Sequence, residues 1–211
     1  MRVNGKMEAV NEAIRAAVPH MQVVARQNPQ AAIFVNTIRF GDEARWLVER
    51  LTPLSEFLWQ DIQAEGVTAL GEALTMVGQA LQPPLIRGYA LPPILVLITD
   101  GLPTDDFRVG LEHLLAQPWG RQAMRLVISV GEDGASPEAQ EMFRAFISGN
   151  GARPLQANNP DTLSRQILWL STTALQVICA PLLRNESPGG EPGPAFPFPA
   201  GFASLDEADI W

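Results

Sequence analysis

The sequence predicts an α/β fold with three layers, in which a doubly wound, mostly parallel sheet carries helices on both faces. Two observations lead to this prediction. Segments with apolar residues at helical spacing alternate along the chain with short apolar runs bounded by glycine, proline or aspartate. The run from Pro93 to Ile98 is apolar throughout, as expected of a parallel strand buried on both faces.

Helices are expected wherever apolar residues recur every three or four positions. The first ends before Asn28-Pro29, because proline disfavours helical geometry in the residue that precedes it. Ser136-Pro137-Glu138 and Asn159-Pro160-Asp161 each combine a capping side chain with a proline at the first helical position. The expected helices cover residues 5–27, 68–81, 107–115, 137–147 and 160–174.

Strands are expected at residues 33–40, 44–48, 93–98, 126–130 and 153–156. Gly41-Asp42 leaves room only for a tight turn, so the first two strands should form an antiparallel hairpin at one edge of the sheet. Residues 51–66 are expected to form a loop. No internal repeat is evident.

Composition excludes several classes of function. The chain has 15 basic and 23 acidic residues, a net charge of −8, which disfavours binding to nucleic acid. Its single cysteine, Cys179, excludes an internal disulfide and fits a reducing compartment. No apolar run reaches the roughly 20 residues of a membrane span, and residues 1–6 do not resemble a signal peptide. A cytoplasmic protein without a membrane partner is therefore expected.

The chain divides at residue 180. After this point prolines and glycines recur too closely for a helix or strand, and the last residues are acidic. We expect a folded domain at 1–180 and a disordered tail at 181–211. Aromatic residues between the prolines of the tail are typical of a short docking motif, but an unselected tail explains them equally well.

Asp100 is the first candidate for chemistry. It follows the apolar run directly, in the segment Thr99-Asp100-Gly101-Leu102-Pro103-Thr104-Asp105-Asp106. Ligands of open α/β sheets bind beyond the carboxyl ends of the strands, where a half-buried carboxylate suits a hard cation. The alternative is that Asp100-Gly101 only makes a turn.

Thr68 is the second candidate, in Gly66-Val67-Thr68-Ala69-Leu70-Gly71-Glu72-Ala73-Leu74. Taken alone, a threonine before an apolar helical face is an ordinary N-cap. In order and spacing, however, the two segments resemble von Willebrand factor A (vWA) domains of the tellurium-resistance-associated, TerY-like type. That family has Gly-x-Thr-x-Leu-Gly-x-Ala-Leu followed by Thr-Asp-Gly-x-Pro-Thr-Asp. The resemblance covers about residues 5–175.

The resemblance implies a metal-ion-dependent adhesion site that holds a cation, usually Mg²⁺. Family members supply an Asp-x-Ser-x-Ser motif after the first strand, a threonine and a later aspartate. Thr68 and Asp100 match the last two contributions. The first has no counterpart, because residues 2–6 lead straight into the first expected helix. The resemblance thus implies a vWA-type sheet without its central first strand, whose sequence would lie upstream of Met1.

Two expectations follow from this departure. Mg²⁺ requires about six oxygen ligands, so the chain should bind it weakly or not at all. Without a central strand the chain should be unstable, split its sheet or recruit a strand from elsewhere.

The expected function is protein binding around Thr68 and Asp100, without catalysis. In a complete domain the cation bridges to an acidic side chain of the partner. The resemblance also implies a bacterial tellurite or stress response, with a kinase and a phosphatase as partners. One alternative is a metal-free scaffold that binds partners through its sheet edge or tail. A less favoured one is an α/β hydrolase or nucleotide-binding enzyme, since no nucleophile elbow or phosphate loop is present.

Other polar residues have simpler interpretations. His20 and His113 fall within expected helices with no metal ligands at suitable spacing. Cys179 is expected to fill space near the end of the last helix. Asp105 and Asp106 are either neighbours of the metal site or acids that favour the start of the next helix.

Overall fold

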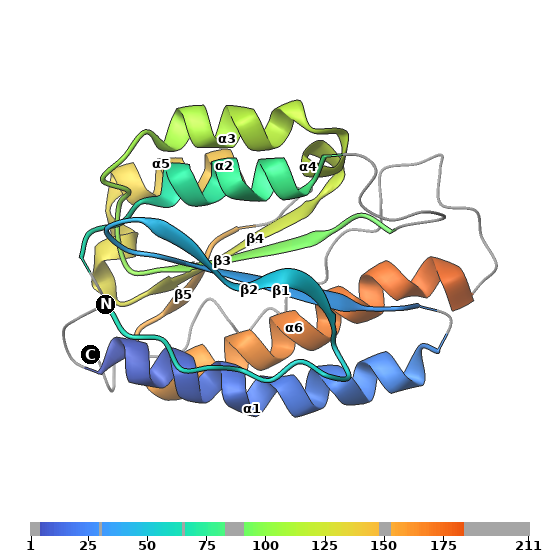
Figure 1. Cartoon of the computed structure of the whole chain (residues 1–211). Coiled ribbons are helices and arrows are strands. Elements are labelled where there is room, and N and C mark those ends of the chain that lie inside the picture. The colour runs from blue at the N-terminus through green and yellow to red at the C-terminus, as the bar shows by residue number, and fades with distance from the viewer. Residues whose placement is uncertain (1–4, 30, 65, 83–90, 148–152, 184–211) are drawn as a thin grey trace.

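The computed structural model describes residues 5–29, 31–64, 66–82, 91–147 and 153–183. Figure 1 shows three layers, with α2, α3 and α5 on one face of the strands and α1 and α6 on the other. The predicted three-layer α/β fold is confirmed. The helices are α1 (Lys6–Gln27), α2 (Leu70–Ala80), α3 (Phe107–Ala116), α4 (Pro118–Gln122), α5 (Pro137–Phe146), α6 (Pro160–Leu183) and the 3₁₀ helix η1 (Glu132–Ala135). The strands are β1 (Phe34–Phe40), β2 (Ala44–Pro53), β3 (Ile94–Thr99), β4 (Met124–Val130) and β5 (Leu155–Ala157).

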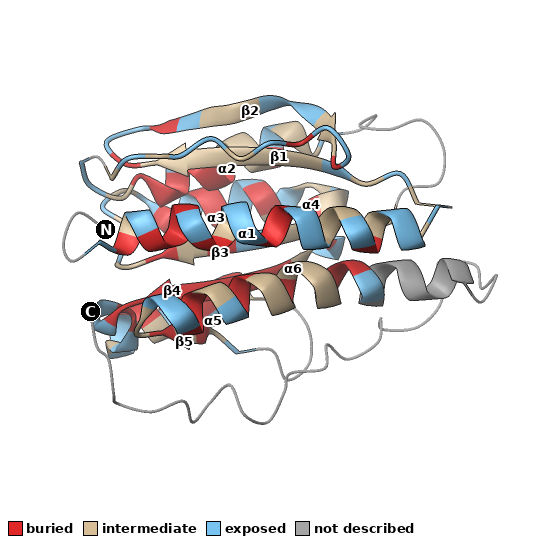
Figure 2. Ribbon diagram, turned by 90° about the horizontal axis from the view of Figure 1, so that it is seen from below, coloured by how far each residue is buried: buried red, intermediate tan, exposed pale blue. Residues whose placement is uncertain are grey.

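The middle layer is divided into two sheets. Strands β1 and β2 form an antiparallel pair, and β3, β4 and β5 form a parallel sheet in that order. No hydrogen-bond ladder joins the two sheets within the described residues. In Figure 2 the order across the layer is β2, β1, β3, β4 and β5. The predicted parallel sheet and antiparallel hairpin are both present, but among the described residues the hairpin forms a sheet of its own and not the edge of the parallel one.

The core lies on both faces of the parallel sheet, in the interior region coloured as buried in Figure 2. On one face, Leu126 and Ile128 of β4 cluster with apolar residues of α1 and α6. On the other, Val127 and Leu97 cluster with residues of α2, α3 and α5. Alternate residues of β4 therefore serve opposite faces, which is why this strand is apolar at successive positions.

The hairpin shares these clusters although it lacks a ladder to the parallel sheet. Phe40 of β1 packs against the cluster that contains Leu97 of β3. Val35 of β1 and Ile94 of β3 both pack against the cluster of Val18 and Leu54. Side-chain packing holds the hairpin in the middle layer, together with main-chain hydrogen bonds of Gly41 and Ala44 to Ala69 and to the Glu72 side chain.

Some element boundaries differ from those predicted. β2 continues to Pro53, where a loop was expected, because Thr52 and Pro53 stand opposite Val35 and Phe34 across the hairpin. The helices α4 and η1 are short pieces without a full apolar repeat, and they were not predicted. α6 runs to Leu183, beyond the boundary expected at residue 180. Residues 184–211, which contain most of the expected tail, lie outside the described residues.

One buried cation fastens the amino end of the parallel sheet. Arg125, at the start of β4, is 8% exposed. Its Nε donates to Phe146 O at 2.7 Å, and its Nη1 donates to Gly120 O at 2.7 Å and Ala123 O at 3.3 Å. Burial lowers the pKa of the Arg125 guanidinium, because desolvation opposes its charge. The carbonyl dipoles offset part of that cost.

No helix among the described residues is both long enough and apolar enough to cross a membrane.

Candidate functional site

Thr68 and Asp100 belong to loops that meet at the carboxyl end of the strands. Asp100 follows directly on the last residue of β3, and Thr68 precedes α2. Two hydrogen bonds of the Thr68 main chain join the loops. Thr104 N donates to Thr68 O at 2.9 Å, and Thr68 N donates to Thr104 Oγ1 at 3.1 Å. The structure thus brings the two predicted segments together.

The end of β1 reaches the same place. Ala69 N donates to Gly41 O at 2.9 Å, directly after β1. Val67 N donates to Asp42 Oδ1 at 3.1 Å. A Cβ at Gly66 would lie 1.6 Å from Asp42 Oδ1, and Gly66 has a φ of 58°. Only glycine therefore allows the chain to pass Asp42 in this conformation on its way to Thr68.

Asp105 caps α2 from outside that helix. Its Oδ1 accepts from Gly71 N at 2.9 Å, and its Oδ2 accepts from Glu72 N at 2.8 Å. These N–H groups belong to the first turn, where a helix lacks internal acceptors and favours negative charge. The carboxylate joins the loop after β3 to α2. Of the two roles left open for Asp105, helix stabilisation is the one observed, but on a different helix from the one expected.

Asp106 has the simpler role. It is the N-cap of α3, and its Oδ1 accepts from Val109 N at 3.1 Å. This agrees with an acid that favours the start of the next helix.

The ordinary N-cap interpretation of Thr68 is wrong. The N-cap residue of α2 is Ala69, and no side chain of that residue caps the helix. The main chain of Thr68 is bonded to Thr104, whereas the half-buried Thr68 side chain makes no hydrogen bond within the described part of the chain.

Asp100 is half-buried next to a turn that its neighbours stabilise. Thr99 is 2% exposed, and its hydroxyl donates to Gly101 O at 3.2 Å. The turn interpretation of Asp100-Gly101 is therefore compatible with the structure. It does not remove Asp100 from the carboxyl end of β3, where a ligand can reach it.

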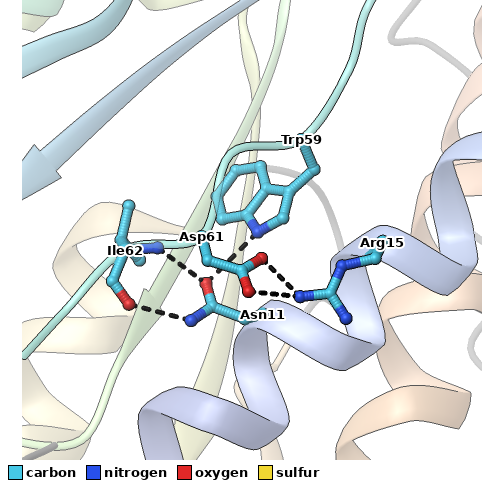
Figure 3. Close-up of polar contacts among 5 residues, drawn as sticks. All are labelled: Asn11, Arg15, Trp59, Asp61 and Ile62. Atoms are coloured by element: carbon cyan, nitrogen blue, oxygen red, sulfur yellow. Dashed lines mark hydrogen bonds and ion pairs between the residues drawn. The ribbon is translucent and has the colours of Figure 1, made fainter.

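The loop that leads from β2 towards Thr68 is fastened to α1, as Figure 3 shows. Asn11 is 6% exposed, and its Nδ2 donates to Ile62 O at 2.8 Å. Asn11 Oδ1 accepts from Ile62 N at 3.0 Å and from Trp59 Nε1 at 3.2 Å. Beside it, Arg15 pairs with the carboxylate of Asp61 on the surface. The Asn11 side-chain amide thus provides hydrogen-bond partners for two main-chain groups and one side-chain group of a loop that has no regular structure.

Lys6 is a feature of this end of the molecule that sequence reasoning missed. Its side chain is 11% exposed, and Nζ lies 3.8 Å from Asp133 Oδ2 in η1. Because the start of a helix disfavours positive charge, nothing in the sequence predicts a buried ammonium in the first turn of α1.

Thr68 and Asp100, the two predicted metal ligands, are too few by themselves for Mg²⁺. Thr68 and Asp100 together offer one hydroxyl and one carboxylate, against about six oxygen ligands for Mg²⁺. Within the described ranges, no group of three or more histidine, cysteine, aspartate or glutamate side chains is placed to hold a metal ion. By itself this donor set does not fit a tightly bound Mg²⁺. His20 and His113 are exposed on α1 and α3.

The layers and the loops at the carboxyl end define a vWA-like α/β fold. A von Willebrand factor type A protein from Catenulispora acidiphila matches with a TM-score of 0.54 and 16% identity, over 80% of this chain and 38% of its own. Proximal thread matrix protein 1 from the mussel byssus matches in two crystal structures, with TM-scores of 0.54 and 0.55 and 12% identity.

The likeness has a defined extent. The match covers 80% and 79% of this chain and 42% of the mussel protein in each case, so this chain spans about two fifths of the length of the structures it resembles. No protein-family model and no curated protein matches the sequence. At these identities the likeness concerns the fold alone.

Proposed function

We propose that this chain is a protein-interaction module of the vWA type, which binds its partner at the surface around Thr68 and Asp100 and catalyses no reaction. The observation that supports this most directly is the junction of the two loops. Thr68 and Thr104 bond to each other, and Asp105 fastens the second loop to α2. Such fastening preorganises a binding surface and lowers the entropic cost of association.

Metal dependence belongs to a complete form of this site. There a magnesium ion, held partly by Thr68 and Asp100, contacts an acidic side chain of the partner. The 211 residues alone bind Mg²⁺ weakly or not at all, because most of the required oxygen ligands are missing.

The resemblance to TerY-like proteins supports a more specific setting. We propose a cytoplasmic role in a bacterial tellurite or stress response, with a kinase and a phosphatase as the partners to test first.

Affinity capture with matched variants tests the proposal. Thr68→Val and Asp100→Ala are compared with the unaltered chain and with Glu141→Gln, a change at an exposed position in α5. Candidate kinase and phosphatase partners, purified separately, serve as probes. We expect both site variants to weaken binding at least about tenfold, or roughly 1.4 kcal/mol, and Glu141→Gln to leave it unchanged. Equal binding by all four chains contradicts the proposal, and substrate turnover contradicts its non-catalytic part.

Magnesium binding is measured separately by calorimetric titration with MgCl₂. We expect no saturable heat below about 1 mM, since two protein ligands leave most of the coordination to water. Tight, stoichiometric binding would show that the chain holds a complete site.

A metal-free scaffold is the second candidate, and the division of the sheet favours it. Within the part of the chain that the structure describes, neither β1 nor β3 has a ladder partner on the edge that faces the other sheet. Partner binding that persists in EDTA and in Asp100→Ala would select this function. Loss of binding on deletion of residues 184–211 would place it on the tail instead.

A further inference from the structure

Lys6 is the only lysine of the chain, whereas arginine supplies the other 14 basic side chains. The residue as a whole is 8% exposed, although lysines are almost never buried to this extent unless they are paired. An ammonium is a compact charge with three N–H donors and no acceptor. A buried lysine therefore needs acceptors for its donors.

The contacts of the Lys6 ammonium leave these donors in need of an acceptor. Asp133 Oδ2 lies 3.8 Å from Lys6 Nζ, which is too far for a hydrogen bond, and the Asp133 side chain is 76% exposed. An ion pair of this kind contributes little to stability. Within the described ranges, Nζ donates no hydrogen bond and makes no ion pair with Glu8 of the same helical turn.

The ammonium lies at the carboxyl end of the parallel sheet. Gly131, which directly follows β4, has a φ of 80°, and a Cβ at this position would lie 2.5 Å from Lys6 Nζ. Glycine therefore leaves the space that the ammonium occupies. β4 is the neighbour of β3, and its Ser129 stands opposite Thr99, the residue before Asp100. Helices α1, α2 and α3 all begin at this end (Figure 1).

The start of α1 adds positive potential at the same place. This helix has 22 residues, and its N-cap residue, Gly5, provides no side chain to accept from the first turn. The unpaired N–H groups of a first turn favour a negative charge and disfavour a lysine. Glu8 is the acid in that turn, and it is exposed. An anion bound at Lys6 would offset the charge of the ammonium and that of the helix start together.

We propose that Lys6 is the anion-binding residue of the candidate site, and that its ammonium directly binds a carboxylate side chain of the partner protein. This inference rests on the proposed function as a protein-interaction module, but the positive charge belongs to this chain and no metal ion is needed. A carboxylate is favoured over a phosphate group by charge. The chain has a net charge of −8 and Asp133 lies beside the ammonium, so a doubly charged ligand is repelled more strongly.

NMR titration of a lysine-labelled chain tests the inference. Because lysine occurs once, a chain labelled with ¹³C only in lysine gives one side-chain Cε signal, which reports on Lys6 alone. The probe is the blocked peptide Gly-Gly-Glu-Gly-Gly, and the control peptide has glutamine in place of glutamate, both in EDTA at constant ionic strength. We expect a saturable shift with the glutamate peptide and a Kd at least about tenfold higher with the glutamine peptide. No saturable shift, or equal Kd values for the two peptides, overturns the inference.

Inorganic phosphate is the second probe, at the same ionic strength. We expect a higher Kd for phosphate than for the glutamate peptide, because of the additional negative charge. A lower Kd for phosphate would identify a phosphate group as the ligand, and that result overturns a carboxylate of the partner.

Three variants of the unlabelled site locate the contact, with the amide signals of the first turn of α1 as the readout. Lys6→Met keeps the apolar stem and removes the charge, whereas Arg15→Met removes an exposed positive charge from the same helix. We expect Lys6→Met to raise the Kd of the glutamate peptide at least about tenfold and Arg15→Met to leave it unchanged. If Lys6→Met unfolds, the comparison of the two peptides with the unaltered chain still decides.

Asp133→Asn separates ligand binding from a purely structural ion pair. We expect this variant to bind the glutamate peptide more tightly, because it removes the acid that competes for the ammonium. Weaker peptide binding by a folded Asp133→Asn chain would mean that Lys6 acts only as the partner of Asp133, and that overturns the inference.

The titration is repeated with Asp100→Ala and Thr68→Val, and the shift of the Lys6 signal should persist in both. Loss of the shift in a folded Asp100→Ala chain would overturn the assignment to Lys6. Equal partner capture by all chains, which contradicts the proposed function, would leave the peptide titration intact. A negative titration would likewise leave the capture result intact, so the two failures are distinguishable.

Discussion

Asp105 stabilises a helix to which it does not belong. Both of its carboxylate oxygens accept main-chain N–H groups in the first turn of α2, while the next residue, Asp106, caps α3. Two adjacent acids therefore fix the starts of two helices and the loop between Asp100 and those helices. The sequence motif that contains Asp105 and Asp106 resembles a metal site, but in the structure these two residues stabilise helix starts.

Removing the Asp105 carboxylate should destabilise the protein more than removing the Asp106 carboxylate. Asp105→Ala leaves two N–H groups of α2 without their charged acceptor, at a cost of about 2–4 kcal/mol. Asp106→Ala removes one N-cap bond, at about 1 kcal/mol. Urea unfolding measures both. Equal effects would mean that the loop reorganises and that α2 is capped in another way.

Thr68 should be nearly neutral for stability. Its hydroxyl makes no hydrogen bond within the described chain, and the N-cap position belongs to Ala69. Thr68→Val keeps the shape of the side chain, so the free energy of unfolding should change by less than about 0.5 kcal/mol. A loss near 1 kcal/mol, the usual effect of deleting an N-cap, would restore the capping role.

The sequence was sufficient to predict that the loops of Thr68 and Asp100 meet at one end of the sheet, because motif order and strand polarity fix that placement. It could not show the roles of Asp105 and Lys6. Those roles depend on which groups from distant segments come within hydrogen-bonding distance, and local patterns hold no such information. Lys6 in particular opposes the usual preference of a helix start.

Helices α2 and α3 make contact through their main chains. A Cβ at Gly110 would lie 2.2 Å from Gly71 O, and one at Gly78 would lie 3.1 Å from His113 O. The glycines therefore allow the two helices to approach each other more closely than residues with a Cβ would. This contact holds α2, the helix that follows Thr68, in position.

Gly110→Ala should separate these helices. A methyl group cannot be accommodated 2.2 Å from a carbonyl oxygen, so we expect a loss of at least about 2 kcal/mol in unfolding free energy. Gly101→Ala is the matched control, because its Cβ would meet nothing within 4 Å. Thermal unfolding of the two variants gives the comparison, and equal melting temperatures would show that α2 and α3 adjust without cost.

The loop before α2 should depend on Asn11. Asn11→Ala removes three hydrogen bonds and leaves Ile62 N, Ile62 O and Trp59 Nε1 without a partner, at about 2–4 kcal/mol. Arg15→Ala removes only an exposed ion pair, at no more than about 1 kcal/mol. Chemical denaturation measures stability. Similar values for the two variants would show that the loop does not rely on the amide.

Long, periodic elements were predicted well, and irregular ones were not. α1, α3 and α5 agree with their apolar spacing and helix starts. α4 and η1 are too short to have a period, and the second half of β2 depends on its pairing with β1. Pairing partners are not visible in the strand's own residues, which is why the strand was ended too early.

At the scale of the whole molecule, the two sheets should differ in local stability. A two-stranded hairpin is marginal by itself, and this one is held by packing against clusters that it shares with β3. We expect the free energy of the opening that permits hydrogen exchange to be at least about 2 kcal/mol lower for amides of β1 and β2 than for amides of β4. Uniform exchange across both sheets, limited by global unfolding, would show that the hairpin and the parallel sheet unfold as one unit.

Arg125 limits how the molecule can vary at the end opposite the candidate site. Its guanidinium donates hydrogen bonds to carbonyl oxygens of α4, of the residue before β4 and of the last turn of α5. Connections at a sheet end ordinarily tolerate added residues, because they lie on the surface. Here an inserted residue between α4 and β4 would move an acceptor away from a buried positive charge. We therefore expect a change in the length of this connection to destabilise the protein far more than the same change in a solvent-exposed connection.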